Sequence, residues 1–413
     1  MKVCVLGAGL AGVTTAWELA RDGHQVVVLD REPQVAAGAS FANGGIVAAS
    51  RPYPWPNPKM AGTFLRALRR NDQAIRIRWQ NDPQFWRWGL QFLAACRTSR
   101  SNEIFEAKRR LVSYSQARLH GIVQETGIEY GRLANGVLYV YRSEKELEQG
   151  WRRSAVMRGL GCAIERLDAA QVAAREPGIS RDAIAGALYA PGDEAGDSAR
   201  FCRELAERSR AKGVHFYLEC ELLGTSVVDQ TVTEAITTKG RIRADAYVFA
   251  LGAYEPKLRE HLGTPPPIYP VKGFSATLPI VKPEAAPRHA GMDESKLIAY
   301  CPLGDRLRVT GGAEFAGHGQ SHAPEDFTRL YEAIDELFPG ATDRVRAHTW
   351  ACLRPMTPES TPRFGTGQYA NLYFNAGQGH MGWAMAAGSA RIVADLVSGK
   401  KPEIDLEGLR VRR

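Results

Sequence analysis

The 413-residue sequence has no apolar run of the roughly 18 residues that a membrane-spanning helix requires. The apolar segment Val3 to Leu6 is cut short by glycines, so we also expect no secretory signal. Low-complexity tracts and internal repeats are missing too. Hydrophobic residues at 44% and charged residues at 24% are near the average of globular chains. The composition excludes disordered, coiled-coil and collagen-like proteins.

Paired cysteines are also missing. The seven cysteines occur singly, with no CxxC motif and no Cys/His cluster at zinc spacing. We therefore expect no metal site and no disulfide framework, but reduced thiols in a cytoplasmic protein. Each cysteine is expected to be a small buried apolar side chain rather than a nucleophile.

The positive charge is concentrated in one stretch. Residues 51–118 contain fourteen Lys and Arg against four acidic residues, an excess of ten in a chain whose total is +8. The same stretch contains Trp79, Phe85, Trp86, Trp88 and Phe92. We favour surface helices whose aromatic face packs inward. The alternative is an element that lies on an anionic membrane. No helix-turn-helix, zinc-finger or RNP-like motif supports a nucleic-acid partner.

The first thirty residues have the pattern of a dinucleotide-binding βαβ unit. A strand over 2–6 runs into a GxGxxG motif, then a helix to residue 22 and a strand over 25–30 that ends in an acid. The glycines allow a tight turn, close approach to a pyrophosphate and close helix packing, and the acid would bind a ribose hydroxyl. We expect cofactor contacts from Gly7, Gly9, Leu10, Ala11, Gly12, Asp30 and Arg31.

Three further glycine-rich segments favour FAD over NAD. They are the loop 38–45, the turn at Gly252 after a buried strand over 244–250, and the loop 377–382 between a strand over 371–375 and a helix over 383–397. The last loop has an alternative role as a plain helix-packing turn. An NAD enzyme would be colourless. We expect these segments, together with Leu222, to contact FAD. The residues are Ala39, Ser40, Asn43, Gly44, Leu222, Gly252, Gly377, Gly379, His380, Met381 and Gly382.

A series of motifs runs in the order of a known family. They are Gly7 to Gly12 with Asp30, Ser40-Phe41-Ala42-Asn43, Pro54-Trp55, Asp193 to Asp197, Tyr269-Pro270-Val271-Lys272-Gly273, Gly312-Ala313-Glu314, Leu353-Arg354-Pro355-Met356-Thr357-Pro358 and Gly382-Trp383. The sequence resembles, nearly end to end, the FAD-bearing small subunit of bacterial D-amino acid dehydrogenase, in the superfamily of D-amino acid oxidase and glycine oxidase. Two departures leave the substrate open. Gln378 replaces a histidine beside an unexpected His380, and Glu359-Ser360 replaces the usual Asp-Gly.

The resemblance and the chemistry together indicate the site residues. Oxidation of an α-amino acid needs a fixed carboxylate and a Cα–H directed at flavin N5. Arg354 is expected to bind the carboxylate bidentately from the end of a strand over 346–353 that Pro355 terminates. Tyr300 and Tyr53 are candidates for sharing that carboxylate. His380 is a candidate contact for flavin C2=O or the amine, with a structural donor as the alternative. No general base is expected.

The expected fold class is α/β, with a Rossmann-like FAD-binding domain and a second α+β substrate domain built on an antiparallel sheet. The FAD domain is expected to comprise residues 1–46, 187–262 and 351–413, and the substrate domain residues 47–186 and 263–350. Asp197 is expected to cap a helix over 198–211, and residues 222–243 to form a small antiparallel meander.

The expected activity is FAD-dependent oxidation of D-amino acids to 2-oxo acids and ammonia, with electrons passed to a quinone. The alternatives are a dehydrogenase narrowed to D-proline or D-hydroxyproline, an oxygen-using D-amino acid or glycine oxidase and, more distantly, a catalytically silent flavoprotein at a membrane. We expect a cytoplasmic enzyme, with peripheral attachment to the inner face of the membrane as an option.

Overall fold

The molecule is built on two large sheets, and the first of them has six strands. The structure, a computed structural model, describes residues 1–68, 75–78, 81–253, 258, 261–263 and 265–411. Five strands of this sheet are parallel and β19 is antiparallel to β20. The strand order is β19 (Arg363–Thr366), β20 (Leu372–Ala376), β13 (Ala246–Phe249), β1 (Lys2–Leu6), β2 (Gln25–Leu29) and β9 (His215–Tyr217). The continuous apolar runs of the central strands β1 and β13 are buried on both faces, as expected of parallel strands.

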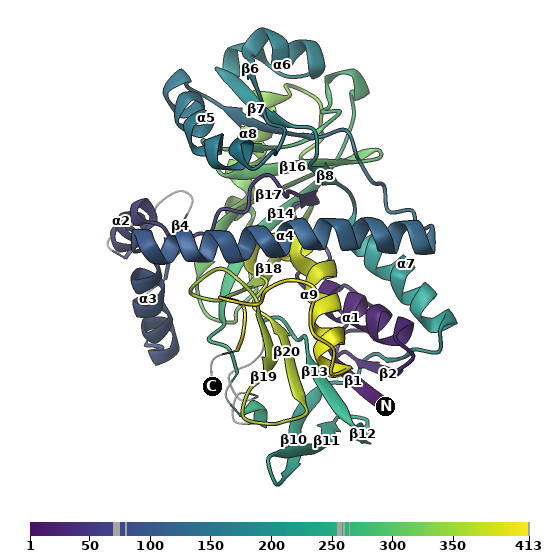
Figure 1. Ribbon diagram of the computed structural model, residues 1–413. Coiled ribbons are helices and arrows are strands. Elements are labelled where there is room, and N and C mark those ends of the chain that lie inside the picture. The colour runs from purple at the N-terminus through teal and green to yellow at the C-terminus, as the bar shows by residue number, and fades with distance from the viewer. Residues whose placement is uncertain (69–74, 79–80, 254–257, 259–260, 264, 412–413) are drawn as a thin grey trace.

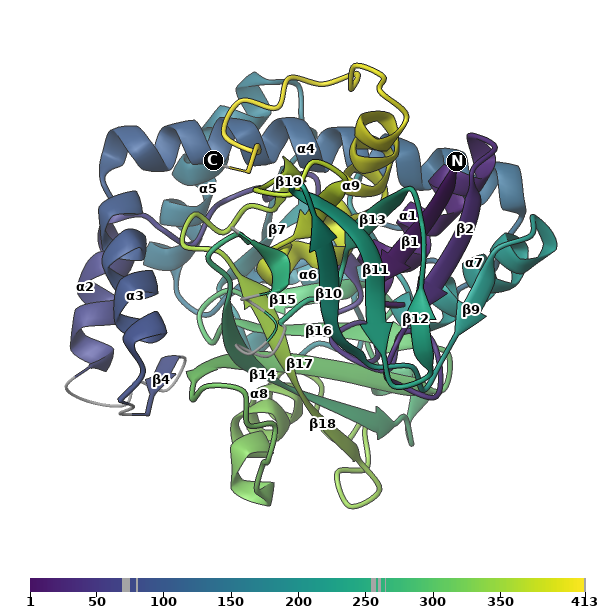
Figure 2. The same cartoon turned by 90° about the horizontal axis from the view of Figure 1, so that it is seen from below.

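Helices cover one face of this sheet and an antiparallel meander covers the other. The helices are α1 (Leu10–Arg21), α7 (Ser198–Ala211) and α9 (Gly382–Val397), and α4 (Thr98–Thr126) packs against α9. Figure 1 shows α4 spanning the width of the molecule. The meander consists of β10 (Leu222–Val228), β11 (Thr231–Thr237) and β12 (Gly240–Ile242), and lies in front of β13, β1 and β2 in Figure 2. These layers enclose the core beneath the GxGxxG motif.

The second half is built on a nine-stranded mixed sheet. Its order is β18 (His348–Met356), β14 (Tyr269–Pro279), β17 (Arg306–Phe315), β16 (Ile298–Leu303), β15 (Ala290–Asp293), β5 (Val137–Tyr141), β7 (Gly186–Ala190) and β6 (Glu165–Asp168), and β4 (Ile75–Ile77) pairs with β17. Helices α8 (Thr328–Leu337) and α6 (Ala169–Arg175) pack on it. Further elements of the described residues are α2 (Pro58–Ala67), α3 (Pro83–Ala95), α5 (Glu144–Gly159), the pair β3 (Ile46–Val47) and β8 (Glu194–Ala195), and short 3₁₀ turns at Arg181–Ala183, Pro283–Ala285, Pro324–Phe327 and Gly379–Met381.

The expected domain limits fall inside strands in three places, one of them between Ile46 and Val47 of β3. The limits at residues 187 and 351 each cut through a strand of the nine-stranded sheet, β7 and β18 respectively. The expected end of a strand at Pro355 is wrong, because β18 continues to Met356. Pro355 is tolerated because β18 is the last strand of the sheet order, and an edge strand has a row of backbone groups with no partner strand. Asp197 caps α7 as expected, since its carboxylate accepts from the N–H groups of Ala199 and Arg200.

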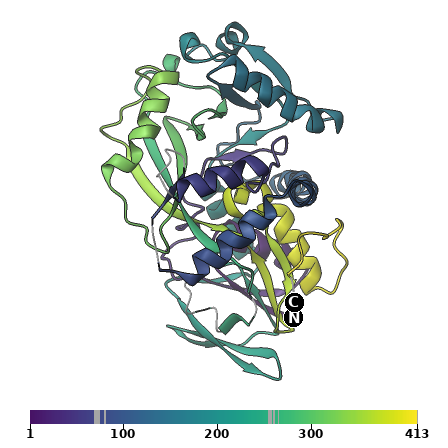
Figure 3. The same cartoon turned by 90° about the vertical axis from the view of Figure 1, so that its left-hand side faces the viewer.

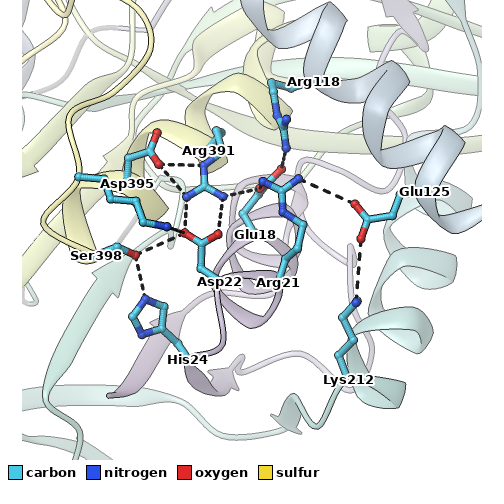
Figure 4. A network of polar contacts seen from close by, with 11 residues as sticks. Glu18, Arg21, Asp22, His24, Arg118, Glu125, Lys212, Arg391, Asp395 and Ser398 are labelled. Atoms are coloured by element: carbon cyan, nitrogen blue, oxygen red, sulfur yellow. Dashed lines mark hydrogen bonds and ion pairs between the residues drawn. The ribbon is translucent and has the colours of Figure 1, made fainter.

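A buried ionic network fastens α1 to α4 and α9 (Figure 4). We call it the Arg391 network and define it as Glu18, Arg21, Asp22, Arg118, Arg391 and Asp395. Arg391 lies 2.8 Å from Glu18, 2.6 Å from Asp22 and 2.8 Å from Asp395. Arg118 of α4 approaches the other oxygen of Glu18 at 2.8 Å. The network therefore fixes the helix of the GxGxxG motif at its carboxyl-terminal end.

Among the residues that the structure describes, no helix is long and apolar enough to cross a lipid bilayer.

Candidate active site

A cavity of about 590 Å³ lies between the two sheets. On one side it is lined by the residues that follow β1, β2 and β13, where the carboxyl ends of parallel strands meet. On the other side it is lined by residues of β14, β16, β17 and β18. A volume of this size is within the range of ligand pockets, and the edge of a parallel sheet where strands end is the usual ligand site of such folds.

The GxGxxG motif forms a tight cradle at the start of α1. Gly7 has a φ of +110°, and a Cβ there would lie 2.5 Å from the carbonyl oxygen of Ala250. A Cβ at Gly12 would lie 1.8 Å from the oxygen of Gly7, so the helix approaches the strand as closely as a glycine permits. Gly9, Leu10 and Ala11 line the cavity at the amino terminus of α1, where the helix dipole favours an anion.

Asp30 follows β2 and lies in the cavity wall. One carboxylate oxygen accepts from the N–H of Ala8 at 2.6 Å and the other accepts from the N–H of Glu32 at 2.9 Å. These two bonds orient the carboxylate beside the glycine cradle. Its position agrees with the expected contact to a ribose hydroxyl.

Sixteen of the eighteen residues expected to contact the cofactor line this cavity. The exceptions are Gly12, which acts through helix packing, and Gly377. A Cβ on Gly377 would lie 2.4 Å from Cγ2 of Thr357, and its φ is +87°. Both glycines therefore allow close packing behind the cavity wall rather than contact with a ligand.

Arg354 lies in the wall contributed by β18. Its Nη1 donates to the carbonyl oxygen of Gly312 at 2.7 Å. The guanidinium lies close against Gly273 of β14, where a Cβ would come within 2.4 Å of Cζ. No carboxylate of the described part of the chain pairs with Arg354, and burial lowers its pKa. A guanidinium placed this way leaves donors for an incoming carboxylate.

The two candidate tyrosines have different surroundings. Tyr53 lines the cavity, and its hydroxyl donates to the carbonyl oxygen of Arg153 at 3.1 Å. Tyr300 is fully buried in the core of the second sheet, where it packs against Phe338 at a ring distance of 5.3 Å. The side chains of Ala299 and Cys301 lie on the opposite face of β16, and Ala299 lines the cavity. The structure therefore does not bring Tyr300 to the site, because strand alternation turns it away.

His380 lies in the 3₁₀ turn between β20 and α9 and lines the cavity. Its ring stacks on Trp55 with a centroid distance of 5.3 Å and an angle of 25°. Its Nδ1 lies 3.4 Å from the hydroxyl oxygen of Ser360. Burial and the positive charges of Lys108 and Arg354 hold the pKa of His380 well below its usual value. The imidazole is therefore neutral at pH 7.

Sequence reasoning missed several residues of this site. Gly273 ends the YPVKG string and makes room for Arg354, and Trp55 supplies the stacking surface under His380. Lys108 was counted only as surface charge, yet its side chain is 0% exposed. The signal was the helical spacing, since Lys108 falls on the buried stripe of α4 that contains Ile104, Ala107, Leu111 and Ser115.

Comparison with known proteins supports the same cofactor. The model of one protein family, described as FAD dependent oxidoreductase, matches residues 2–396. The chain belongs to the FAD-dependent oxidoreductase family. Among curated relatives of this oxidoreductase, "D-amino acid dehydrogenase 2" of Mesorhizobium japonicum is 40% identical over 412 residues, which is 99% of each chain. "D-amino acid dehydrogenase" of Rhizorhabdus wittichii is 41% identical over 416 residues, 100% of each chain.

Solved structures agree with the fold of an FAD-dependent oxidoreductase. Glycine oxidase from Bacillus cereus has a TM-score of 0.76 at 22% identity, covering 100% of this chain and 99% of the other. L-proline dehydrogenase from P. horikoshii has a TM-score of 0.75 at 18% identity, covering 97% and 94%. The predicted fold class, enzyme class and FAD cofactor are confirmed.

The cavity fits FAD. The glycine cradle and the amino terminus of α1 suit the pyrophosphate, Asp30 suits the ribose, and the turn at Gly379–Met381 borders the part of the cavity shared with Arg354. When bound, FAD supplies two-electron oxidation chemistry. The protein supplies binding, orientation and charge around it.

Proposed function

We propose that this chain catalyses FAD-dependent oxidative deamination of D-amino acids to 2-oxo acids and ammonia. The observation that supports the proposal is Arg354, a partly buried cation in the cavity wall with no carboxylate partner in the described chain. Burial of an unpaired cation costs free energy, and a ligand carboxylate that pairs with Arg354 offsets this cost. The full-length relatives named D-amino acid dehydrogenase favour the D enantiomer.

The residues of the cavity have separate tasks in this reaction. Arg354 binds the substrate carboxylate and, with one N–H already held by Gly312, has a fixed orientation. Trp55 and His380 form a flat wall beside it. The neutral imidazole presents a polar edge without adding charge near the substrate amine. Tyr53 lines the same cavity, but its hydroxyl is already bonded to Arg153.

The visible spectrum of the purified protein tests this function. The protein should be yellow, and D-amino acids added without oxygen should bleach the flavin absorbance. L-enantiomers and glycine should leave the absorbance unchanged. Bleaching by glycine or by L-amino acids alone would contradict the substrate class, and a yellow protein that no amino acid bleaches would contradict the activity.

We further propose a quinone as the electron acceptor. After anaerobic bleaching, a short-chain ubiquinone analogue and air-saturated buffer are added to separate samples, and the return of the flavin absorbance is timed. The quinone should restore the absorbance faster than oxygen does. Faster recovery with oxygen would identify an oxidase instead.

A peripheral membrane contact is proposed for α2 and α3, which face the viewer in Figure 3. Phe85, Trp88 and Phe92 pack inward, as the favoured interpretation of this stretch predicts, whereas Leu90 is 70% exposed, Leu65 50% and Trp86 37%. The exposed Arg66, Arg87 and Arg97 add positive charge to this surface. Arg69, Arg70 and Trp79 lie outside the described residues. Exposed apolar side chains among arginines suit an anionic bilayer.

Liposomes containing anionic lipid test this contact. The protein should sediment with them at low salt and be released by high salt, because the attraction is screened. Leu90→Glu should reduce binding. Val345→Glu is the matched control, since Val345 is 90% exposed in the turn before β18. Equal binding by both variants, or none by the wild type, would contradict the contact.

A further inference from the structure

A hydrogen-bonded chain of three side chains leads from the cavity into the protein core. Nζ of Lys108 donates to the hydroxyl oxygen of Ser360 at 3.3 Å, and that hydroxyl lies 3.4 Å from Nδ1 of His380. Lys108 comes from the middle of α4 and Ser360 from the turn after β18, and both are buried. His380 ends the chain in the cavity wall. Its other ring nitrogen, Nε2, makes no hydrogen bond to a protein atom of the described residues.

The backbone at Ser360 holds this hydroxyl in place at a conformational cost. Ser360 has a φ of +59°, in the left-handed region that favours glycine. Its N–H donates to the carbonyl oxygen of Thr357 at 2.9 Å, which closes the turn. A serine in such a conformation is typical of a position that is constrained by function.

Among the described residues, the charged groups around Lys108 leave it without an ionic partner. Glu359, which precedes Ser360 in the turn, pairs with Arg363 at 2.8 Å. Glu106, on the same helix as Lys108, pairs with Arg109 at 3.0 Å. The remaining groups are His380 from the 3₁₀ turn and Arg354 from β18, which carry no negative charge. Burial lowers the pKa of Lys108 to about 7. Its amine is therefore able to gain and lose a proton near neutral pH.

The protonation state of Lys108 determines the tautomer of His380. A lysine ammonium only donates, so the Ser360 hydroxyl accepts from it and gives its own hydrogen to Nδ1, which leaves the proton of the imidazole on Nε2. A neutral lysine amine accepts from Ser360, whose oxygen then accepts from Nδ1–H. In that state Nε2 presents a lone pair to the cavity.

We propose that Lys108, Ser360 and His380 form a proton relay that accepts a proton from the substrate ammonium group. The substrate R–NH₃⁺ gives one proton to Nε2 of His380, Nδ1–H passes its proton to the Ser360 hydroxyl, and the hydroxyl proton moves to Nζ of Lys108. The products are R–NH₂, the Nε2–H imidazole, the intact serine and a lysine ammonium. No electrons move, and the charge is transferred from substrate to Lys108.

The relay rests on the proposed function and gives it the missing proton acceptor. An α-amino group is largely protonated at neutral pH, and its nitrogen lone pair must be free before the Cα–H bond is oxidised to the imine. Acceptance of this proton inside the cavity removes the need for the rare neutral substrate from solution. The proton leaves by the reverse path when the product is released.

The test compares flavin reduction as a function of pH in matched variants. The first is Ser360→Gly, which suits the backbone conformation and removes the hydroxyl, and the second is Lys108→Met. Asp229→Gly is the control, because Asp229 also has a positive φ, +47°, but lies in the turn between β10 and β11. The rate of anaerobic bleaching divided by the substrate dissociation constant is measured for D-alanine and for D-trifluoroalanine, whose electron-poor amine is neutral at lower pH.

With D-alanine near pH 7, Ser360→Gly and Lys108→Met should each lower this ratio by roughly 100-fold, and the loss should vanish as the pH approaches the pKa of the free amine. With D-trifluoroalanine both variants should equal the wild type, because no proton needs to be removed. Asp229→Gly should match the wild type throughout. A loss that is the same at every pH and for both substrates, or no loss, would overturn the relay.

A second measurement does not depend on turnover. ¹⁵N shifts of the His380 ring are followed from about pH 6 to about pH 9, the range around the Lys108 pKa. The wild type should change from the Nε2–H to the Nδ1–H tautomer, and Ser360→Gly should not. A wild-type ring that keeps one tautomer would overturn the relay even if D-amino acids bleach the flavin. Conversely, a tautomer change without bleaching by any D-amino acid would contradict the proposed substrate and not the hydrogen-bonded chain.

Discussion

Arg391 is a buried arginine and Arg354 a partly buried one, and the two have opposite surroundings. Arg391 contacts three carboxylates, and the burial that would lower its pKa is outweighed by the hydrogen bonds that it donates to Asp22 and Asp395, so the pKa rises. Arg354 contacts one backbone carbonyl and no carboxylate of the described chain, and its pKa falls. Lys108, in the core behind the cavity wall, has one serine as its partner.

The difference separates groups that stabilise the fold from groups that are ready to bind. In the Arg391 network each charge is neutralised within the protein, so its removal affects folding. Arg354 and Lys108 lack a carboxylate partner among the described residues, so the folded state bears a cost that a ligand relieves. Burial alone does not distinguish the two, whereas the count of satisfied donors does.

Arg391→Met should cause the largest loss of stability. It leaves the buried Glu18 and the half-buried Asp22 without their cation, and breaking such a network costs roughly 3 to 5 kcal/mol of unfolding free energy. Denaturant unfolding measures the loss. Arg152→Met is the control, since the exposed pair of Arg152 with Glu148 should contribute under about 1 kcal/mol. Equal losses would show that the network does not stabilise the fold.

The Arg391→Met effect should also depend on pH. Burial raises the pKa of Asp22, but hydrogen bonds from Arg391 and Lys400 outweigh it and lower the pKa to about 2. A lowered carboxyl pKa gives stability above the unfolded value near 4 that is lost as the pH falls toward 2. The difference between wild type and variant should therefore shrink in acid. A constant difference would contradict the role of Asp22.

Lys108→Met should do the reverse and stabilise the protein. The folded pKa of about 7 lies below the unfolded value near 10.4, so the folded state is penalised most at and below pH 7 and the penalty fades between pH 7 and about 10. We expect a gain on the order of 4 to 5 kcal/mol near pH 6 that declines toward pH 10. Unfolding at both pH values tests this. A loss of stability would show that Lys108 is paired.

Arg354→Met should affect binding rather than folding. Loss of a charge-assisted contact to the substrate carboxylate costs about 1.5 to 3 kcal/mol, which is roughly 10- to 150-fold in affinity. The dissociation constant is measured from the flavin spectrum during anaerobic titration, and unfolding is measured in parallel. Arg354→Lys keeps the charge without the planar fork and should give an intermediate affinity. Unchanged affinity with Arg354→Met would contradict the role of Arg354.

Tyr300→Phe should have the smallest effect. The Tyr300 hydroxyl is buried with no hydrogen-bond partner among the described residues, so its removal should change stability by less than about 1 kcal/mol and in the stabilising direction. Substrate affinity should not change. An affinity loss as large as that of Arg354→Met would place Tyr300 back in the site.

The cofactor end of the site was predictable because its signals are local. The glycine spacing at residues 7–12, and Asp30 at the end of the next strand, fix both the turn and the cavity edge within one βαβ unit. The helix over 198–211 and the meander over 222–243 were equally local, since capping and alternation decide them. Tertiary contacts have little influence on such segments.

The substrate end was less predictable because its residues meet only in the folded chain. Lys108 and Ser360 are 252 positions apart. Tyr300 was misplaced because the sequence does not say which face of β16 the cavity occupies, and a shift of one residue exchanges the faces. The expected domain limits cut β3, β7 and β18, because the residues of a strand do not determine which strands it pairs with.

The order of the six-stranded sheet has a consequence for synthesis of the protein. β1 is central in the order β20-β13-β1-β2, and β20 begins at Leu372. At about 5 to 20 residues per second, the ribosome needs from roughly 20 s to more than a minute to make the chain between β1 and β20. From its own synthesis until that of β20, β13 lacks the neighbour on one side, and the wall formed by the Gly379–Met381 turn does not exist until the chain passes β20. FAD therefore finds a complete site only after translation is nearly finished, and a nascent chain truncated before β20 exposes a sheet edge prone to aggregation.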